Sequence, residues 1–236
     1  MVRALSIRTR RLLRSGKPYP FAGGYGETAR GLINMASNES PFGPSPSVLK
    51  AIRRAVSLIG FYPDPGVDGL KKKVAGYLGI GSDHLVFGNG SDELIDIVCK
   101  SFLDMGDKVL IPLPTFSFYE IASRVNGGVP KFMKLRGFRW DSRELVSAAK
   151  DVKLVFIGRP NNPTGNGVDV GGIEDLLDAG KVVVVDEAYA EFAGYSVIGL
   201  VRRRENLVVL RTFSKAFGLA GLRVGYAVAH PNIAEV

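Results

Sequence analysis

Cysteine is nearly absent from the sequence, since Cys99 is the single residue of this type among 236. One thiol cannot form an internal disulfide, and it cannot supply the several ligands of a zinc cluster. The two histidines, His84 and His230, stand far apart and are interpreted as structural. We therefore expect no disulfide framework and no metal site, and the single thiol indicates a reducing, cytoplasmic location.

Long uncharged apolar runs are also lacking. None approaches the roughly 18 residues that a transmembrane helix needs, and the start of the chain lacks the continuous apolar core of a signal peptide. The composition is 46% hydrophobic and 23% charged, which is typical of a globular chain and excludes a mainly disordered, collagen-like or coiled-coil protein. The length predicts one large domain, or one and a half.

Acidic residues are missing from the start of the chain, where Glu27 is the first carboxylate. The same stretch carries a run of basic residues, namely Arg3, Arg8, Arg10, Arg11, Arg14 and Lys17. An arginine-rich, acid-free start occurs in transit peptides and in arms that bind nucleic acid. We favour a solvated arm that lies across a partner subunit. Most of the +8 net charge belongs to this arm, so we expect neither a nucleic-acid nor a membrane partner.

Short β-branched runs alternate with longer mixed segments from residue 84 onward. The predicted strands are 84–88, 108–112, 131–135, 153–158, 181–185, 207–211 and 223–229. Most segments between them are long enough for a helix, and 92–103 has helical spacing behind Ser91, a candidate N-cap. The alternation predicts an α/β domain with a mostly parallel seven-stranded sheet and helices on both faces.

The front of the chain is organised differently. Residues 15–46 are rich in Gly, Pro, Ser and Asn and are interpreted as an extended arm. Residues 46–59 have apolar side chains at helical spacing behind Pro46, which suits the first turn of a helix. We therefore divide the chain into an N-terminal arm with the first helix, 1–60, and a larger domain, 61–236.

Five predicted strands end in polar, turn-forming or aromatic clusters. These clusters are Gly88–Glu93, Pro114–Phe116, Pro160–Gly165, Asp186–Tyr189 and Thr212–Lys215. Taken alone, each suits an ordinary turn or helix cap, although a carboxylate after four valines needs a partner. In open α/β sheets, ligands bind beyond the carboxyl ends of the strands. Clusters at five strand ends therefore predict a binding site.

The residue types in these clusters point to one cofactor. A lysine amine, a buried carboxylate, a tyrosine and hydroxyls beside an arginine are the groups that bind and activate pyridoxal phosphate. Competing motifs are absent, because the sequence has no P-loop, no full GxGxxG fingerprint and no GxSxG elbow.

Six segments of the sequence resemble the histidinol-phosphate aminotransferase family, fold-type-I enzymes within the class I/II aminotransferases. These segments are NESPFGP (38–44), YPDP (62–65), GNGSDE (88–93), PNNPTG (160–165), DEAY (186–189) and TFSKAFGLAGLRVGY (212–226). They follow the family's order, and the resemblance runs from about residue 17 to the end. Threonine-phosphate decarboxylases carry the same motifs, so decarboxylation is the alternative reaction.

The resemblance implies roles for individual residues. The implied catalytic residues are Lys215, which binds the cofactor covalently and moves the proton, Asp186, which pairs with the pyridine nitrogen, and Tyr189. Tyr189 and Asn162 bind the phenolic oxygen, and Phe116 stacks on the ring. The implied phosphate-binding residues are Gly90, Ser91, Asp92, Thr212, Ser214 and Arg223, with Tyr62 reaching the other subunit's cofactor. Tyr25 and Asn38 are implied to bind substrate.

The resemblance also implies a reaction and its partners. The family exchanges an amino group between histidinol phosphate, a small phosphorylated amino compound, and 2-oxoglutarate, with glutamate on the other side of the cycle, in histidine biosynthesis. The role of Tyr62 implies a homodimer. The family's C-terminal small domain, with the arginine that binds the substrate carboxylate, is expected to be missing. A cofactor-binding remnant with little turnover is therefore a further alternative. Arg159 departs from the family's small residue at its position.

Overall fold

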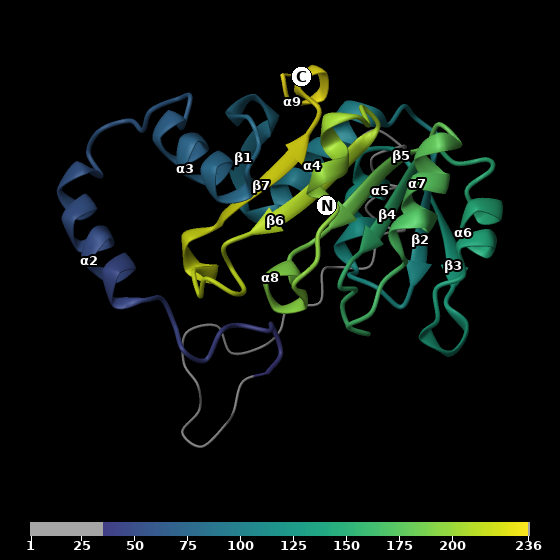
Figure 1. Ribbon diagram of the computed structural model, residues 1–236, viewed down its shortest axis with the longest axis horizontal. Coiled ribbons are helices and arrows are strands. Elements are labelled where there is room, and N and C mark those ends of the chain that lie inside the picture. The colour runs from purple at the N-terminus through teal and green to yellow at the C-terminus, as the bar shows by residue number, and fades with distance from the viewer. Residues whose placement is uncertain (1–34, 236) are drawn as a thin grey trace, which may run out of the picture. The chain divides into compact units, whose positions relative to one another are not determined.

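The structure is a computed structural model that describes residues 35–235 (Figure 1). The basic arm and Tyr25 therefore lie outside the described residues. The described chain divides into two compact units. We call residues 38–94 and 185–235 the terminal unit and residues 95–184 the central unit, and each is described by itself.

All seven predicted strands are present. They are β1 (Leu85–Asn89), β2 (Lys108–Leu113), β3 (Val129–Lys134), β4 (Leu154–Gly158), β5 (Val182–Asp186), β6 (Leu207–Thr212) and β7 (Val224–Ala229). They form one sheet in the order β1-β7-β6-β5-β4-β2-β3, with helices on both faces (Figure 1). Runs of Val, Ile and Leu predict β4, β5 and β6, which are buried almost throughout and apolar as strands covered on both faces usually are. β1 and β3 are only partly buried. The predicted fold class is confirmed.

Eight α-helices are described among residues 35–235. They are α2 (Pro46–Ala55), α3 (Asp68–Leu78), α4 (Gly90–Phe102), α5 (Phe118–Val125), α6 (Ser142–Ala148), α7 (Val170–Asp178), α8 (Ala190–Ala193) and α9 (Pro231–Ala234). The helix predicted at 46–59 starts at Pro46 as expected, behind the cap Ser45, and its last turn is a separate 3-10 helix, η1 (Val56–Leu58). None of the described helices has the length and apolar character needed to cross a membrane.

The predicted N-cap of α4 is wrong. The helix begins at Gly90, so Ser91 lies in its first turn and does not precede it. Gly90 has φ +82°, a value that favours glycine, and it lets β1 lead directly into the helix. The loop that a separate cap residue would need is therefore absent.

In the terminal unit, β7 lies between β1 and β6 and runs antiparallel to both (Figure 1). Leu85 of β1 lies opposite Val228, and Val208 of β6 lies opposite Ala229. The connection from β6 to β7 contains only a 3-10 helix, η5 (Ala220–Leu222). A parallel pair would need a longer crossover, usually a helix. The sheet is therefore mixed, with β7 antiparallel to its two neighbours.

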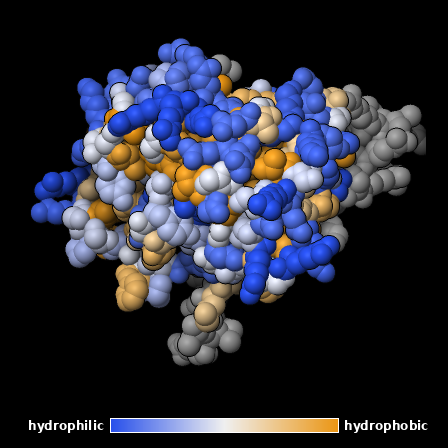
Figure 2. All heavy atoms as spheres, turned by 45° about the vertical axis from the view of Figure 1, so that its right-hand side comes forward, coloured by the Kyte–Doolittle hydropathy of each residue, from blue (hydrophilic) through white to orange (hydrophobic). Residues whose placement is uncertain are grey.

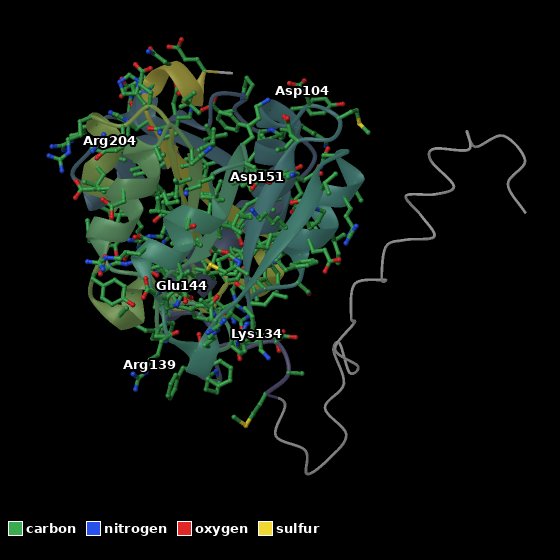
Figure 3. The ribbon with its side chains drawn as sticks, turned by 90° about the vertical axis from the view of Figure 1, so that its right-hand side faces the viewer. Asp104, Lys134, Arg139, Glu144, Asp151 and Arg204 are labelled. Atoms are coloured by element: carbon green, nitrogen blue, oxygen red, sulfur yellow. The ribbon has the colours of Figure 1, made fainter. Side chains whose placement is uncertain are left out.

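In the central unit, β2 pairs in parallel with β3 and with β4. Its core includes Tyr119 of α5, whose ring stacks on Phe156 of β4 with centroids 4.7 Å apart. Lys108 and Lys131 both pair with Asp151, at 2.6 and 2.5 Å. Figure 3 shows Asp104, which precedes β2, and Lys134, the last residue of β3, at opposite ends of these strands.

Exposed apolar side chains gather on the segment from α2 to Tyr62. Hydrophilic side chains cover most of the face drawn in Figure 2. By contrast, α2 and η1 contain no buried residue. Ile59, Phe61 and Tyr62 are 84%, 75% and 101% exposed. A monomeric protein seldom exposes so many large apolar side chains in one stretch, so this surface suits an interface.

Candidate active site

The candidate site is built around the turn that follows β6. Thr212 and Ser214 are buried there, and the Oγ1 of Thr212 accepts a hydrogen bond from the Ser214 amide at 3.1 Å. The Thr212 hydroxyl donates to Ser214 Oγ at 3.0 Å. The Gly218 amide donates to the Lys215 carbonyl at 3.0 Å and closes the turn. Two hydroxyls are therefore held together at the end of the buried strand β6, in the turn that also carries Lys215.

Lys215 is half-buried, and its Nζ lies 5.8 Å from the centroid of the Tyr189 ring. Burial lowers the pKa of this lysine below its ordinary value of 10.5, and the positive charge of Arg223 acts in the same direction. The carboxylates of Asp92, Glu39 and Asp186 oppose that shift in pKa. The amine therefore loses its proton more readily than the amine of an ordinary exposed lysine.

Asp186 and Tyr189 face Lys215 from the end of β5. Asp186 is 7% exposed, and its Oδ1 accepts the amide of Ala188 at 3.0 Å. The phenol of Tyr189 accepts a hydrogen bond from Asn38 Nδ2 at 2.9 Å. Burial raises the pKa of Tyr189, as does the charge of Asp186, whereas the bond from Asn38 lowers it. A buried carboxylate and a protonated phenol thus stand beside the lysine.

An anion-binding corner forms where α4 begins. The Nη2 atom of Arg223 lies 3.6 Å from Oδ2 of Asp92. A side chain at Gly90 would place its Cβ only 2.5 Å from Arg223 Nη2. A Cβ at Gly225 would lie 2.6 Å from the Ser91 amide nitrogen. The N-terminus of a helix and a guanidinium are both attracted to anions, so this corner suits a phosphate.

Asp92 and Glu93 are acidic residues in the first turn of α4, and Asp92 lies beside Arg223. Burial raises the pKa of the Asp92 carboxyl, while the positive charges of Arg223 and Lys215 act to lower that pKa. The carboxylate of Asp92 is therefore attracted to both cations.

A buried ion pair between Arg211 of β6 and Glu187, the residue after β5, was not predicted from the sequence motifs. Arg211 and Glu187 are 6% and 0% exposed at their side chains and lie 2.8 Å apart. Glu187 also accepts hydrogen bonds from the Ser196 hydroxyl and the Val197 amide, both at 2.7 Å. A signal was available, because an arginine in the apolar run LVVLRT requires a buried partner of opposite charge.

Two predicted site residues belong to the central unit. Phe116 is half-buried, with its ring centroid 5.6 Å from that of Tyr119. Asn162 is half-buried and follows Asn161, whose amide donates to the Pro114 carbonyl and to Thr164 Oγ1 at 2.9 and 2.8 Å. The structure therefore gives the local setting of each, within its own unit.

Arg159 now has a structural explanation. Its Nε donates to the Val168 carbonyl at 3.0 Å, and its side chain packs against Gly167. It therefore fastens the loop between β4 and α7. Tyr62, by contrast, is fully exposed, so its side chain lies apart from the other candidate residues that the structure describes.

The remaining predicted residues meet in the terminal unit. They are Asn38, Gly90, Ser91, Asp92, Asp186, Tyr189, Thr212, Ser214, Lys215 and Arg223.

Comparison with known proteins finds histidinol-phosphate aminotransferases among the relatives of this chain. Histidinol-phosphate aminotransferase 2 of Carboxydothermus hydrogenoformans is 40% identical over 240 residues, which cover 96% of this chain and 66% of that protein. Histidinol-phosphate aminotransferase 2 of Archaeoglobus fulgidus is 42% identical over 204 residues, covering 86% of this chain and 59% of that protein. The chain thus spans two thirds or less of the length of these relatives.

Solved structures agree on the fold. Histidinol-phosphate aminotransferase from Sinorhizobium meliloti, in complex with pyridoxal-5'-phosphate, matches with a TM-score of 0.79 and 31% identity over 84% of this chain and 56% of that chain. L-threonine-O-3-phosphate decarboxylase from Porphyromonas gingivalis matches with a TM-score of 0.74 and 24% identity, over 86% and 62% of the two chains. The family description "Aminotransferase class I and II" matches residues 30–236. The chain therefore belongs to the class I and II aminotransferase family.

Proposed function

We propose that this chain carries the pyridoxal-phosphate site of a transaminase that exchanges an amino group between histidinol phosphate and 2-oxoglutarate. The observation that supports this most is the meeting of Lys215, Asp186 and Tyr189 in the terminal unit. The names of the relatives, at 40% and 42% identity, favour histidinol phosphate as the substrate.

The residues present fit a phosphorylated pyridine cofactor. Because Gly90 has no side chain, the Arg223 guanidinium can lie directly against the backbone at the start of α4. Thr212 and Ser214 add two buried hydroxyls. These groups would hold the phosphate, together with the amides near Ser91 and Asp92. When bound, pyridoxal phosphate supplies an electron sink for the substrate's reacting carbon.

Lys215 would bind the cofactor and then move the proton of the substrate. Its lowered pKa favours the neutral amine, which is the form that can attack a carbonyl or accept a proton. Asp186, buried at the end of β5, would keep a proton on the pyridine nitrogen through a charge-assisted bond. Tyr189 and Asn162 would donate to the phenolic oxygen, and Phe116 would stack on the ring.

A homodimer is part of the proposal. Tyr62 is fully exposed, as expected of a side chain that would reach the cofactor phosphate of a second copy. The apolar residues between Val56 and Phe61 would be covered in the same contact. We also propose that residues 1–60 act as an arm with the first helix and residues 61–236 as the cofactor-binding domain, in the cytoplasm.

Decarboxylation of threonine phosphate is the alternative reaction, since the Porphyromonas gingivalis decarboxylase has the same fold as this chain. Threonine phosphate and histidinol phosphate both carry an amine and a phosphate, and the anion-binding corner, which would hold the cofactor's own phosphate, does not discriminate between them. The released product does discriminate, because only decarboxylation gives carbon dioxide.

Cofactor binding is the first test, since the chain spans two thirds or less of its relatives' length. Titration with pyridoxal phosphate should give a visible absorption band, and borohydride should then fix the cofactor's mass on Lys215. Lys215→Ala should lose both signals, and Lys100→Ala, which changes an exposed lysine on α4, should keep them. If wild-type protein gives no band, the proposal fails. Glutamate formation against carbon dioxide release then separates the two reactions.

A further inference from the structure

The segment Asn38–Pro44 contacts the candidate site at two places. At one end, Asn38 Nδ2 donates to the Tyr189 hydroxyl at 2.9 Å, across 151 positions of sequence. At the other end, Gly43 lies against Gly218 in the turn that follows Lys215. The segment therefore forms a strap, residues 38–44, that is fixed to both elements carrying the site chemistry.

The contact at Gly218 leaves no room for a side chain. A Cβ there would lie 2.5 Å from the Gly43 carbonyl oxygen, and Gly218 has φ +67°. Gly43 also has a positive φ, +65°, and its amide donates to the Ser40 carbonyl at 3.3 Å. Two glycines thus set the path of the strap over the turn. Between the two contacts, the charge of Glu39 acts on Lys215.

The direction of the Asn38 bond decides what Tyr189 can do. A phenol has one proton, and its oxygen can also accept a hydrogen bond. Because the Asn38 amide donates to this oxygen, the single phenolic proton is left to point elsewhere. A bond accepted by the oxygen also polarises the O–H group and strengthens its donation to the next acceptor.

We propose that Asn38 is a positioning residue that directs the proton of Tyr189 toward the cofactor's phenolic oxygen. This inference rests on the proposed function, because it needs the cofactor in the site. It gives Asn38 a role through Tyr189, separate from the direct contact with substrate that the motif resemblance implies. The left-handed backbone of Asn38, φ +53°, suits Asn and Asp better than most residues.

The discriminating variant is Asn38→Asp, which keeps the shape and the backbone preference but removes the N–H donor. The dissociation constant of this variant for pyridoxal phosphate should be about fivefold higher than that of the wild type. A change of this size is the effect of one lost hydrogen bond of ordinary strength. The pH midpoint of the visible band should rise, because Tyr189 then stabilises the deprotonated phenolic oxygen less well. Ser40→Ala, in the same strap, should change neither quantity.

Asn38→Asp in a Tyr189→Phe background separates two effects: the action of residue 38 through the Tyr189 hydroxyl, and the direct effect of the new carboxylate on the cofactor. If Asn38 acts through the phenol, Asn38→Asp shifts the midpoint further in the parent than when residue 189 is Phe, where only the new charge acts. Equal shifts in both backgrounds would show a direct effect of the new charge and would overturn this inference alone. If the wild-type chain gives no band at all, the proposed function is overturned and this inference with it.

Discussion

Arg211 and Glu187 form a buried ion pair between the ends of two strands that carry candidate site residues. Arg211 Nε donates to Glu187 Oε2 at 2.9 Å, and Arg211 Nη1 lies 2.7 Å from Oε1 of Glu191. Glu187 directly follows Asp186, and Arg211 directly precedes Thr212. The pair therefore fixes the ends of β5 and β6 on which a carboxylate and a hydroxyl of the site stand.

Replacing one member of this pair should be costly. Arg211→Met leaves the carboxylate of Glu187 buried without its cation, and such a change usually removes about 3–5 kcal/mol of stability. The double variant Arg211→Met with Glu187→Gln should recover part of that loss, because the charge of Glu187 is then gone and only that of Glu191 remains without its cation. Urea unfolding of the wild type, both single variants and the double variant gives the coupling energy.

The matched control is the pair of Arg124 and Glu120 on α5, which also lies within hydrogen-bonding distance, at 2.8 Å. Its side chains are 31% and 37% exposed, so Arg124→Met should cost at most about 1 kcal/mol. Similar losses at Arg124 and Arg211 would contradict the importance assigned to burial.

The sequence was informative where a pattern is local. The valine run at 181–185 predicts a buried strand in any fold, and the polar residues after it predict a ligand at the strand end. Strand direction is not local, since the run at 223–229 is equally apolar whether β7 is parallel or antiparallel. The bond from Asn38 to Tyr189 spans 151 positions, so spacing carries no information about it. Arg211 was detectable as a charge in an apolar run, but its partner was not specified.

The strap contact predicts a specific effect at Gly218. Gly218→Ala places a methyl group 2.5 Å from the Gly43 carbonyl oxygen, in a backbone conformation that alanine disfavours. We expect a loss of about 2–4 kcal/mol in the free energy of unfolding, from steric overlap and the positive φ together. Thermal or urea unfolding measures it.

Gly194 is the matched control for this substitution. It has φ +71°, and nothing lies within 4 Å of its added Cβ. Gly194→Ala should therefore lower the free energy of unfolding by about 1–2 kcal/mol, the cost of placing alanine at a positive φ alone. If both variants lose the same stability, the strap does not press on the turn after Lys215.

Asn161 should stabilise the central unit through its side-chain amide. It is 2% exposed, its Oδ1 accepts the Thr115 hydroxyl at 2.6 Å, and its Nδ2 donates to Pro114 and Thr164. Asn161→Ala removes three bonds from a buried side chain to half-buried partners, so we expect a loss of about 2–4 kcal/mol. The control Asn232→Ala removes one exposed bond to Glu205 and should cost less than about 1 kcal/mol. Equal losses would show that the Asn161 bonds are exchanged for water without penalty.

The reactivity of Lys215 should depend on pH in a way that Asp92 controls. Burial lowers the pKa of Lys215, and the negative charge of Asp92 acts to raise it. Asp92→Asn removes that charge, so the pKa of Lys215 should fall further and the neutral amine should appear at lower pH. An acylating reagent attacks the neutral amine only, so the pH of half-maximal labelling at Lys215 should move downward.

Peptide mass spectrometry of the ligand-free chain measures this labelling, with the exposed Lys72 in the same digest as reference. Lys72 should label identically in wild type and variant, which shows that the reagent acts equally on both. The opposite change is expected from Arg223→Gln, because removing a positive charge beside Lys215 raises its pKa. An upward movement with Asp92→Asn, or the same direction for both variants, would contradict the arrangement of charges around this amine. Opposite movements would show that Asp92 and Arg223 both act on Lys215 by charge, the condition that the proposed phosphate corner requires.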